Sequence, residues 1–236
     1  MAIGITDLGS GYDNTDGTSY VGASLSPAAN SLLMFPYSTR HGSTGCTGTV
    51  SGLGLTWIKT VTEQVDGLST LGCWHAQCSA SPGSGALTLS IDAGITAIGA
   101  SATILQVTGH NTTTPIVTTY QAAIGLTGAT GTITFSALAN SGNAQLASFM
   151  HRGNTASTPK AGWTAAADGF NNAPNHGCRS EWKIGAFDAS ATMTWTSARW
   201  QGLGVEIAVA GGAPATPKLY VPITHRNHLG QMAGRA

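Results

Sequence analysis

The chain has 236 residues, of which 42% are apolar and only 8% are charged, and its formal net charge is zero. Disordered chains combine few apolar residues with high charge, so this composition excludes disorder, and the zero net charge implies no bulk attraction to nucleic acid or to an anionic membrane. A surface with so few charges limits the solubility of a free monomer, so we expect the chain to work inside an assembly.

Short segments rich in Thr, Val, Ile and Trp are separated by Gly, Asn, Ser and Pro throughout the chain. Several alternate apolar and polar residues with a period of two, which is the pattern of a strand with one buried face. In residues 191–199, for example, Met193 and Trp195 share a face with Ala191, and threonines occupy the other face. In chain order, we predict strands at residues 19–25, 31–38, 55–62, 68–77, 86–91, 101–108, 116–121, 131–137, 144–151, 179–187, 191–199 and 202–209.

No segment keeps a helical period of 3.6 residues for three turns, and residues 125–131 predict a tight turn between two strands. Many short strands without intervening helices favour an all-β fold, an antiparallel β-sandwich of jelly-roll-like type. We expect one sandwich domain at residues 21–210, an extended N-terminal arm at residues 1–20 and an extended C-terminal arm at residues 211–236.

The N-terminal segment has no basic region followed by an apolar region, so a secretory signal is not expected. The sequence also contains no run of about 18 apolar residues, so a membrane span is not expected.

The two predicted arms carry opposite charge. Residues 1–39 contain three Asp and no Lys or Arg, whereas residues 211–236 contain one Lys and two Arg and no acidic residue. Opposite charges on two arms favour head-to-tail contacts between copies through orientation. Polar, mobile termini are common, and that simpler interpretation stays open.

The C-terminal arm also carries apolar side chains, which need a partner when they are exposed. The stretch KLYVPITH, residues 218–225, is suited to lie as an added strand along a sheet edge, where Pro222 limits the pairing. The residues predicted to form an interface are Lys218, Leu219, Tyr220, Val221, Ile223, Arg226 and Leu229.

Several cysteines and histidines, the usual side-chain ligands of zinc, lie near one another in the sequence. Cys73, His75 and Cys78 lie close in sequence, with Cys46 or the pair His176 and Cys178 as further candidates. On a strand, Cys73 and His75 point to one face and Cys78 to the other, so the spacing does not suit zinc. Residues 13–17 (DNTDG) have the oxygen-rich look of a calcium loop but lack its terminal acidic residue, and a simple turn is the better interpretation. We predict no metal and no other cofactor.

No catalytic constellation stands out. The sequence has no Gly-x-Ser-x-Gly elbow and no Walker loop. A glycosidase needs two neighbouring carboxylates, and Glu181 and Glu206 lie in predicted strands that allow such a pair, but the acidic pool is small. We therefore predict that the protein is not an enzyme.

Six tryptophans are present, and four of them, at positions 57, 74, 182 and 195, lie mid-strand among apolar neighbours, as core residues do. Trp163 and Trp200 lie nearer to strand ends, so they are the candidates for an exposed, sugar-stacking role.

Five segments resemble β-sandwich proteins encoded by tailed bacteriophages. They are NSLLMF (30–35), SGLGLTWIK (51–59), CWHA (73–76), ATILQVTG (102–109) and QGLGVEIA (201–208), which together cover about residues 20–210. The resemblance implies a jelly-roll-type virion protein, either a capsid decoration or cement protein or a tail or fibre component. It implies partners among copies of the chain and the major capsid or tail proteins, assembly in the host cytoplasm, and no catalytic residue.

Two classes of function therefore remain open. The first is a structural virion subunit that buries its arms and sheet edges against neighbours. The second is a carbohydrate-binding β-sandwich module, which requires Trp163 or Trp200 to be exposed. A hydrolase is a third and weaker possibility.

Overall fold

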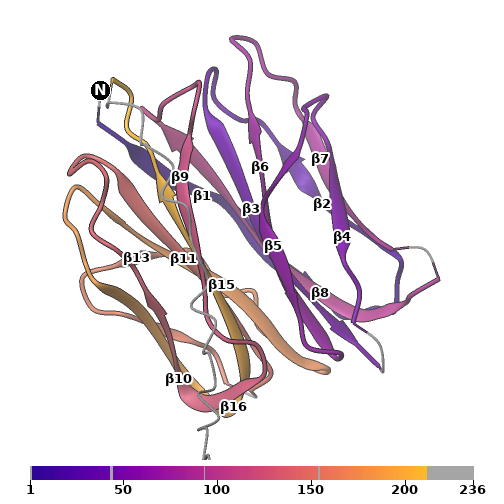
Figure 1. Ribbon diagram of the computed structural model, residues 1–236. Helices are drawn as coiled ribbons and strands as arrows, with labels where there is room; N and C mark the ends of the chain where they lie inside the picture. Colours follow the sequence, from indigo (N-terminus) through magenta and orange to yellow (C-terminus); the bar gives the residue numbers. More distant parts are fainter. Residues whose placement is uncertain (1, 43–44, 93, 154, 212–236) are drawn as a thin grey trace, which may run out of the picture.

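The computed structural model describes residues 2–42, 45–92, 94–153 and 155–211, and over these residues every regular element is a β-strand (Figure 1). All the strand pairs are antiparallel, so the predicted all-β antiparallel sandwich class is confirmed. The strands are β1 (Gly4–Asp13), β2 (Ser19–Leu25), β3 (Leu32–His41), β4 (Gly48–Gly52), β5 (Ile58–Val65), β6 (Ser69–Gln77), β7 (Gly85–Ile91), β8 (Ala97–Thr108), β9 (Ile116–Gln121), β10 (Leu126–Thr134), β11 (Ala144–His151), β12 (Thr158–Pro159), β13 (Thr164–Ala165), β14 (Asn171–Asn172), β15 (Asn175–Ile184) and β16 (Ser190–Ile207).

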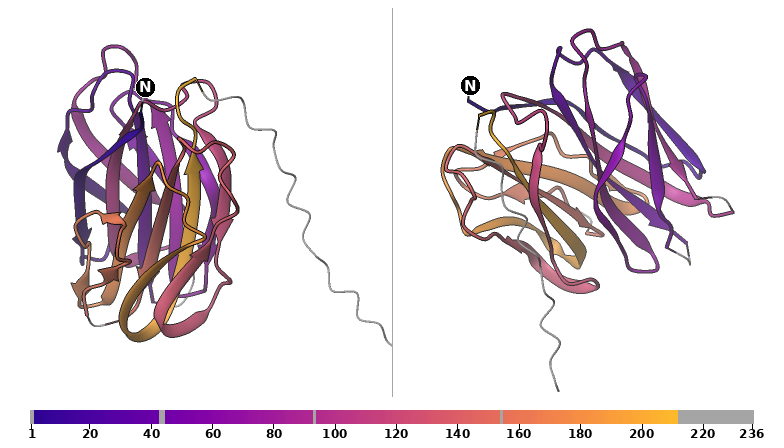
Figure 2. Two further views of the ribbon diagram at one scale, coloured as in Figure 1. Left: turned by 90° about the vertical axis from the view of Figure 1, so that its left-hand side faces the viewer. Right: turned by 45° about the horizontal axis from the view of Figure 1, so that its top comes forward.

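The strands form three sheets stacked in layers. The central sheet has the order β1-β8-β3-β6-β5, and the small sheet has the order β2-β7-β4. The large sheet has the order β10-β16-β11-β15-β13, with β9 and β12 also paired to β16 and β14 to β15. In Figure 1 the large sheet, in pink and orange, lies on the left and the two purple sheets on the right, and the right-hand view of Figure 2 shows the same separation.

An inner core fills the space between the central and large sheets. Leu32 and Met34 of β3 and Leu105 of β8 pack there against Leu146 of β11 and Val205 of β16. A second core, the small-sheet core, lies on the other face of the central sheet, where Phe35 and Tyr37 meet Leu87 and Leu89 of β7. Strand β3 is therefore apolar on both faces, as expected for a strand covered on both sides.

A third cluster, the outer core, lies on the far side of the large sheet. Strand β16 is 18 residues long; its first half pairs with β10 and its second half with β11 and β9. Phe149 of β11 packs there with Trp195 and Trp200 of β16, and Trp163 and Ile133 complete the cluster. The large sheet thus has apolar side chains on both faces.

The structure changes several sequence-based boundaries. Predicted strands 19–25, 116–121 and 144–151 coincide with β2, β9 and β11. The prediction of a turn at residues 125–131 is wrong, because residues 126–131 belong to β10 and pair with β16. The two predicted strands 191–199 and 202–209 are one continuous strand up to residue 207, β16.

The prediction of an N-terminal arm is also wrong for the residues that form β1. Strand β1 pairs with β8 from Gly4↔Thr108 to Asp13↔Ala100 and forms the edge of the central sheet. Ile3 and Ile5 pack against the inner core, so backbone pairing and apolar burial both hold this segment in the fold. The predicted C-terminal arm lies, apart from Gly211, outside the described residues.

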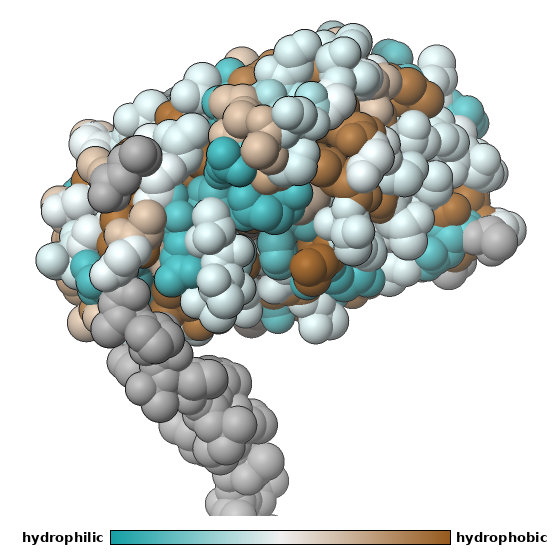
Figure 3. All heavy atoms as spheres, turned by 90° about the horizontal axis from the view of Figure 1, so that it is seen from above, coloured by the Kyte–Doolittle hydropathy of each residue, from teal (hydrophilic) through white to brown (hydrophobic). Residues whose placement is uncertain are grey.

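The surface reflects the composition. Seen from above, most of it is pale in hydropathy colour, with small polar and apolar patches between (Figure 3). This pattern fits a chain rich in Thr, Ser, Ala and Gly rather than in charged residues.

Candidate functional site

The seven residues predicted at an interface, Lys218 to Leu229, lie outside the described residues. The described residues can therefore show a surface to which this segment could bind, but not the segment itself.

The prediction that Trp163 and Trp200 are exposed is wrong. Their side chains are 8% and 6% exposed, and both belong to the outer core. Trp163 Nε1 donates a hydrogen bond to Asp188 Oδ2 at 3.1 Å, and the Trp200 ring lies 6.0 Å from that of Trp195. Neither ring face is free to stack a sugar, so the two residues that supported carbohydrate binding are structural.

The tryptophans that reach the surface are two of those expected in the core. Trp57 is half-buried edge-on against Phe35, at 6.2 Å between ring centroids. Trp74 is also half-buried, and Lys59 Nζ lies 5.3 Å from its ring centroid. This cation covers the exposed ring rather than leaving it open to a ligand.

The candidate metal ligands are scattered among the cores. Within the described ranges, no three His, Cys, Asp or Glu side chains lie close enough together to hold a metal ion. All four cysteines are free and buried, and burial raises the pKa of the Cys73 and Cys178 thiols to about 12. Thiols held in the protonated form are poor nucleophiles and poor metal ligands.

The segment that resembles a calcium loop forms a local turn. Asp13 Oδ1 accepts hydrogen bonds from the Thr15 side chain and from Thr15 N, at 2.5 and 2.8 Å. These bonds lower the pKa of Asp13 and keep it anionic. One carboxylate in a turn of this kind explains the local sequence without an ion.

Glu181 and Glu206 are both fully buried in the large sheet, but they bind different loops. Glu181 Oε2 accepts a hydrogen bond from Lys160 N at 2.8 Å, and Glu206 Oε1 accepts from Ala139 N at 2.8 Å and from Asn143 Nδ2 at 2.6 Å. Each carboxylate therefore fastens a loop to the sheet, which is a structural use.

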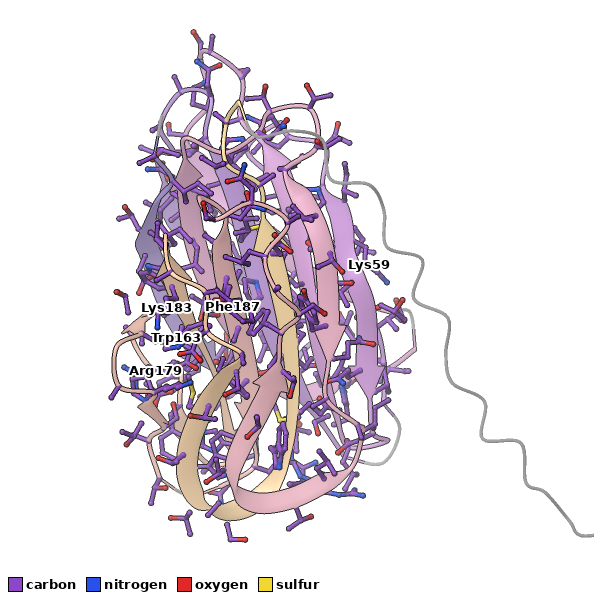
Figure 4. All side chains as sticks on the ribbon, turned by 60° about the vertical axis from the view of Figure 1, so that its left-hand side comes forward. Lys59, Trp163, Arg179, Lys183 and Phe187 are labelled. Atoms are coloured by element: carbon purple, nitrogen blue, oxygen red, sulfur yellow. The ribbon has the colours of Figure 1, made fainter. Side chains whose placement is uncertain are left out.

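A polar cluster gathers around Asp188, at the turn between β15 and β16. Lys160 Nζ lies 2.8 Å from Asp188 Oδ1, and Lys183 Nζ lies 3.3 Å from Asp188 Oδ2. Figure 4 shows Lys183, Trp163 and the 46% exposed Phe187 on the same side of the molecule. The bond from Lys160 is the main reason why the pKa of Asp188 lies below its usual range. Both lysines are ion-paired with this one carboxylate, so none of the three groups is free to act as an acid or base.

An apolar groove, by contrast, is open to a ligand. It has a volume of about 330 Å³ and lies between β1, at the edge of the central sheet, and β2, at the edge of the small sheet. Its floor includes Phe35, Leu89 and Ile104, and residues 8–13 and 20–25 form its sides.

Glycines make this groove hollow. Gly9 and Gly11 of β1 pair with Ile104 and Ala102 of β8, whose side chains pack on the small-sheet core. A Cβ atom added at either glycine would meet nothing within 4 Å. The side chains that would normally fill the edge of the sandwich are therefore missing.

Both sides of the groove are strand edges without a second neighbour in the part of the chain that the structure describes. Strand β1 pairs with β8 and β2 with β7, and each is the last strand of its sheet. Tyr12 is 55% and Val21 69% exposed beside these edges. Unpaired backbone groups next to exposed apolar side chains are the features that accept an added strand.

The groove is not predicted by the sequence, because the expected N-terminal arm at residues 1–20 includes the strand β1 that lines it. The signal that could have found it is the alternation of Gly9, Gly11 and Asp13, which leaves one face of a strand bare.

In comparisons with protein-family models, curated proteins and solved structures, nothing matches the chain. None of the described residues belongs to a helix that could cross a membrane.

Proposed function

We propose that this chain is a non-enzymatic structural subunit whose copies are joined by strand addition. The C-terminal segment of one copy occupies the groove between β1 and β2 of a second copy. The observation that carries the proposal is this groove, which is apolar and hollow and is bordered by two strand edges that no further strand of the described residues covers.

The C-terminal segment has the chemistry that the groove requires. In an extended conformation Leu219, Val221 and Ile223 share one face, because strand side chains alternate. Residues 218–223 span about 20 Å when extended, which is the length of the six-residue stretch of β1 that lines the groove. Burial of these three aliphatic side chains would contribute about 1.5–3 kcal/mol each to the free energy of association.

Charge supports the same pairing. Asp13 lines the groove and Asp16 follows it, whereas Lys218 and Arg226 flank the apolar residues of the C-terminal segment. Opposite charges at the rim of an interface fix orientation and speed association.

The connection favours a second copy over the chain's own groove. The described chain ends beside Gly109, whose carbonyl accepts a hydrogen bond from Ala210 N at 2.8 Å. Pro214 and Pro217 lie between this point and residue 218, and proline-rich links act as stiff, extended spacers. In the proposed contact, such a spacer would present the apolar stretch to a second copy.

The resemblance to phage β-sandwich proteins and the scarcity of surface charge extend the proposal to its setting. The subunit would belong to a phage-like virion, where it decorates or stabilises the capsid or forms part of the tail. Repeated contacts between neighbouring copies would then add through multivalency. Electron microscopy of the native source tests this part: a regular lattice of the chain supports it, and a soluble pool with no particle association contradicts it.

Truncation tests the contact itself. We expect the full chain to form concentration-dependent oligomers in size-exclusion chromatography with light scattering, and residues 1–211 to be monomeric. A labelled peptide of residues 212–236 should bind the truncated protein in fluorescence anisotropy, and Val221→Asp in that peptide should weaken binding at least tenfold. Equal oligomer formation with and without the segment would refute the proposal. A monomeric full chain that excludes the peptide would instead place the segment in its own groove.

A groove-filling variant tests the location. Gly11→Leu should fold, since its Cβ meets open space, and should weaken binding of the peptide at least tenfold. Gly42→Leu is the matched control, because a Cβ at Gly42 also meets nothing within 4 Å but lies outside the groove. Unchanged peptide affinity in the Gly11 variant would show that the peptide binds elsewhere.

A further inference from the structure

Three arginines gather around one aspartate where the central and large sheets meet. Arg152 N, just after β11, donates a hydrogen bond to the carbonyl of Arg199 in β16 at 2.9 Å. Arg199 Nη1 lies 3.9 Å from Asp66 Oδ2, in the turn between β5 and β6. Arg40, in β3, donates to the carbonyl of Leu68 in the same turn at 2.8 Å.

This cluster differs from the other cations of the described residues. Lys59, Lys160, Arg179 and Lys183 each lie within 4 Å of a carboxylate, as members of the pairs Lys59–Glu63, Lys160–Asp188, Arg179–Asp168 and Lys183–Asp188. Within the described ranges the three arginines share only Asp66, which leaves a formal excess of two positive charges.

Asp66 is also largely occupied by its own turn. Its Oδ1 accepts hydrogen bonds from Leu68 N, Ser69 N and Ser69 Oγ at 2.8–3.1 Å. Its side chain is 2% exposed, and Oδ2 receives no hydrogen bond. The carboxylate therefore neutralises one charge and leaves the remaining guanidinium donors unmatched.

Among the described residues, no other neighbour supplies the missing negative charge. His41 and His151, which flank Arg40 and Arg152 in the chain, are neutral at pH 7, since burial lowers the pKa of each to about 4. His176 is also buried, and its pKa is lowered to about 3. The charge of Asp168 acts to raise the pKa of His151, against the larger effect of burial. Asp168 is already paired with Arg179, whose Nη1 lies 3.9 Å from Asp168 Oδ2.

One guanidinium donor lies buried and unused. Arg152 Nη1 is shielded from solvent and has no hydrogen-bond partner among the described residues, and a buried donor left unpaired is destabilising, more so when it is charged. Burial, and in addition the charge of a neighbouring arginine, lower the pKa of both Arg40 and Arg152. Arg199 is 39% exposed, so the cluster has a buried floor and an open rim.

We propose that Arg40, Arg152 and Arg199 bind a phosphate dianion. Two negative charges match the formal excess, and the planar guanidinium fork suits tetrahedral oxyanions. The anion would lie at the open rim, beside the exposed Arg199, and would relieve the repulsion among the three cations. The site lies apart from the groove between β1 and β2, so it stands independently of the proposed assembly.

Inorganic phosphate is the probe. At constant ionic strength set with sodium chloride, we expect phosphate to raise the unfolding temperature of the full chain saturably, and isothermal titration calorimetry to give one site per chain. Arg199→Gln removes the most accessible cation and should raise the phosphate dissociation constant at least tenfold. Lys183→Gln is the control and should keep the wild-type response, because Lys183 pairs with Asp188 elsewhere.

A second readout does not depend on detecting the complex. Without phosphate, Arg199→Gln should be at least as stable as the wild type, because it removes repulsion among three cations that share one carboxylate. Stabilisation by chloride equal to that by phosphate, or an unchanged phosphate response in Arg199→Gln, would overturn the proposal. Binding that is lost equally in Lys183→Gln would show general charge attraction and overturn it as well.

Discussion

Glu181 illustrates how one buried side chain couples the fold to pH. It is fully buried in the large sheet; Oε2 accepts a hydrogen bond from Lys160 N, and Oε1 has no partner in the part of the chain that the structure describes. Burial raises the pKa of Glu181 to about 7 from an ordinary value of 4.5, although Lys160 acts against this shift. The folded state therefore holds a proton that the unfolded state releases at lower pH.

The sign of the pH effect follows from this difference. Between pH 4.5 and 7 the unfolded state is ionised at this position and the folded state is not, so the free energy of unfolding falls as pH rises. Glu181→Gln removes the titration. We expect its stability relative to the wild type to increase by roughly 1–3 kcal/mol from pH 4.5 to pH 7.5, measured by urea denaturation. The exposed Asp16→Asn serves as a control, and a pH-independent difference for Glu181→Gln would contradict the prediction.

At the scale of elements, β10 shows why glycine can belong to a strand. Gly131 faces the outer core, where an added Cβ would lie 2.6 Å from Trp195, 2.9 Å from Phe149 and 3.0 Å from Trp200. The absence of a side chain lets three aromatic rings pack against the backbone of β10. The same glycines gave the sequence its turn-like appearance.

We expect Gly131→Ala to lower the free energy of unfolding by about 1–3 kcal/mol, because the aromatic rings must shift to admit the methyl group. Gly128→Ala, in the same strand, is the matched control: its Cβ would come no nearer than 3.8 Å to other atoms, so we expect a change below about 1 kcal/mol. Chemical denaturation followed by tryptophan fluorescence measures both. Equal losses in the two variants would show that backbone effects, rather than packing on the rings, decide the cost.

Strands that carry a recognisable group of apolar residues were predictable, and strands without one were not. β2, β9 and β11 have the bounds that their sequences predict. β1 and β4 have the sequences GITDLGSGYD and GTVSG, which lack a clear apolar face. Backbone pairing with neighbouring strands holds them in the fold, rather than burial of many apolar side chains of their own. Local sequence carries no record of those partners.

At the scale of the whole molecule, the three-layered arrangement explains why the sequence did not predict the burial of two tryptophans or the presence of the groove. Trp163 and Trp200 lie near the ends of the strands that the sequence predicts, which favours exposure in a sandwich with a single core. They are buried because the curved first half of β16 creates a third cluster on the outside of the large sheet. The groove likewise depends on how two sheets end side by side, which no single segment encodes.

The layered arrangement also predicts a gradient of protection. Strand β3 has β8 and β6 as neighbours and a core on each face, whereas β1 and β2 are edge strands. We expect amides of β3 to exchange with deuterium at least 100-fold more slowly than those of β1 and β2, because central elements open only with global unfolding. Hydrogen-exchange mass spectrometry measures this, and equal protection of β1 and β3 would contradict it. The experiment is best done on residues 1–211, where the proposed occupant of the groove is absent.

The order of the layers along the chain has a consequence for biosynthesis. The central and small sheets are made from residues 4–108, and the large sheet from residues 116–207. All strands of the central and small sheets therefore leave the ribosome before the large sheet can be completed. Until the second half emerges, Leu32, Met34 and Leu105 lie uncovered on one face of the central sheet. The nascent protein would thus pass through an aggregation-prone intermediate, whose exposed apolar face chaperones or rapid completion of translation would have to protect.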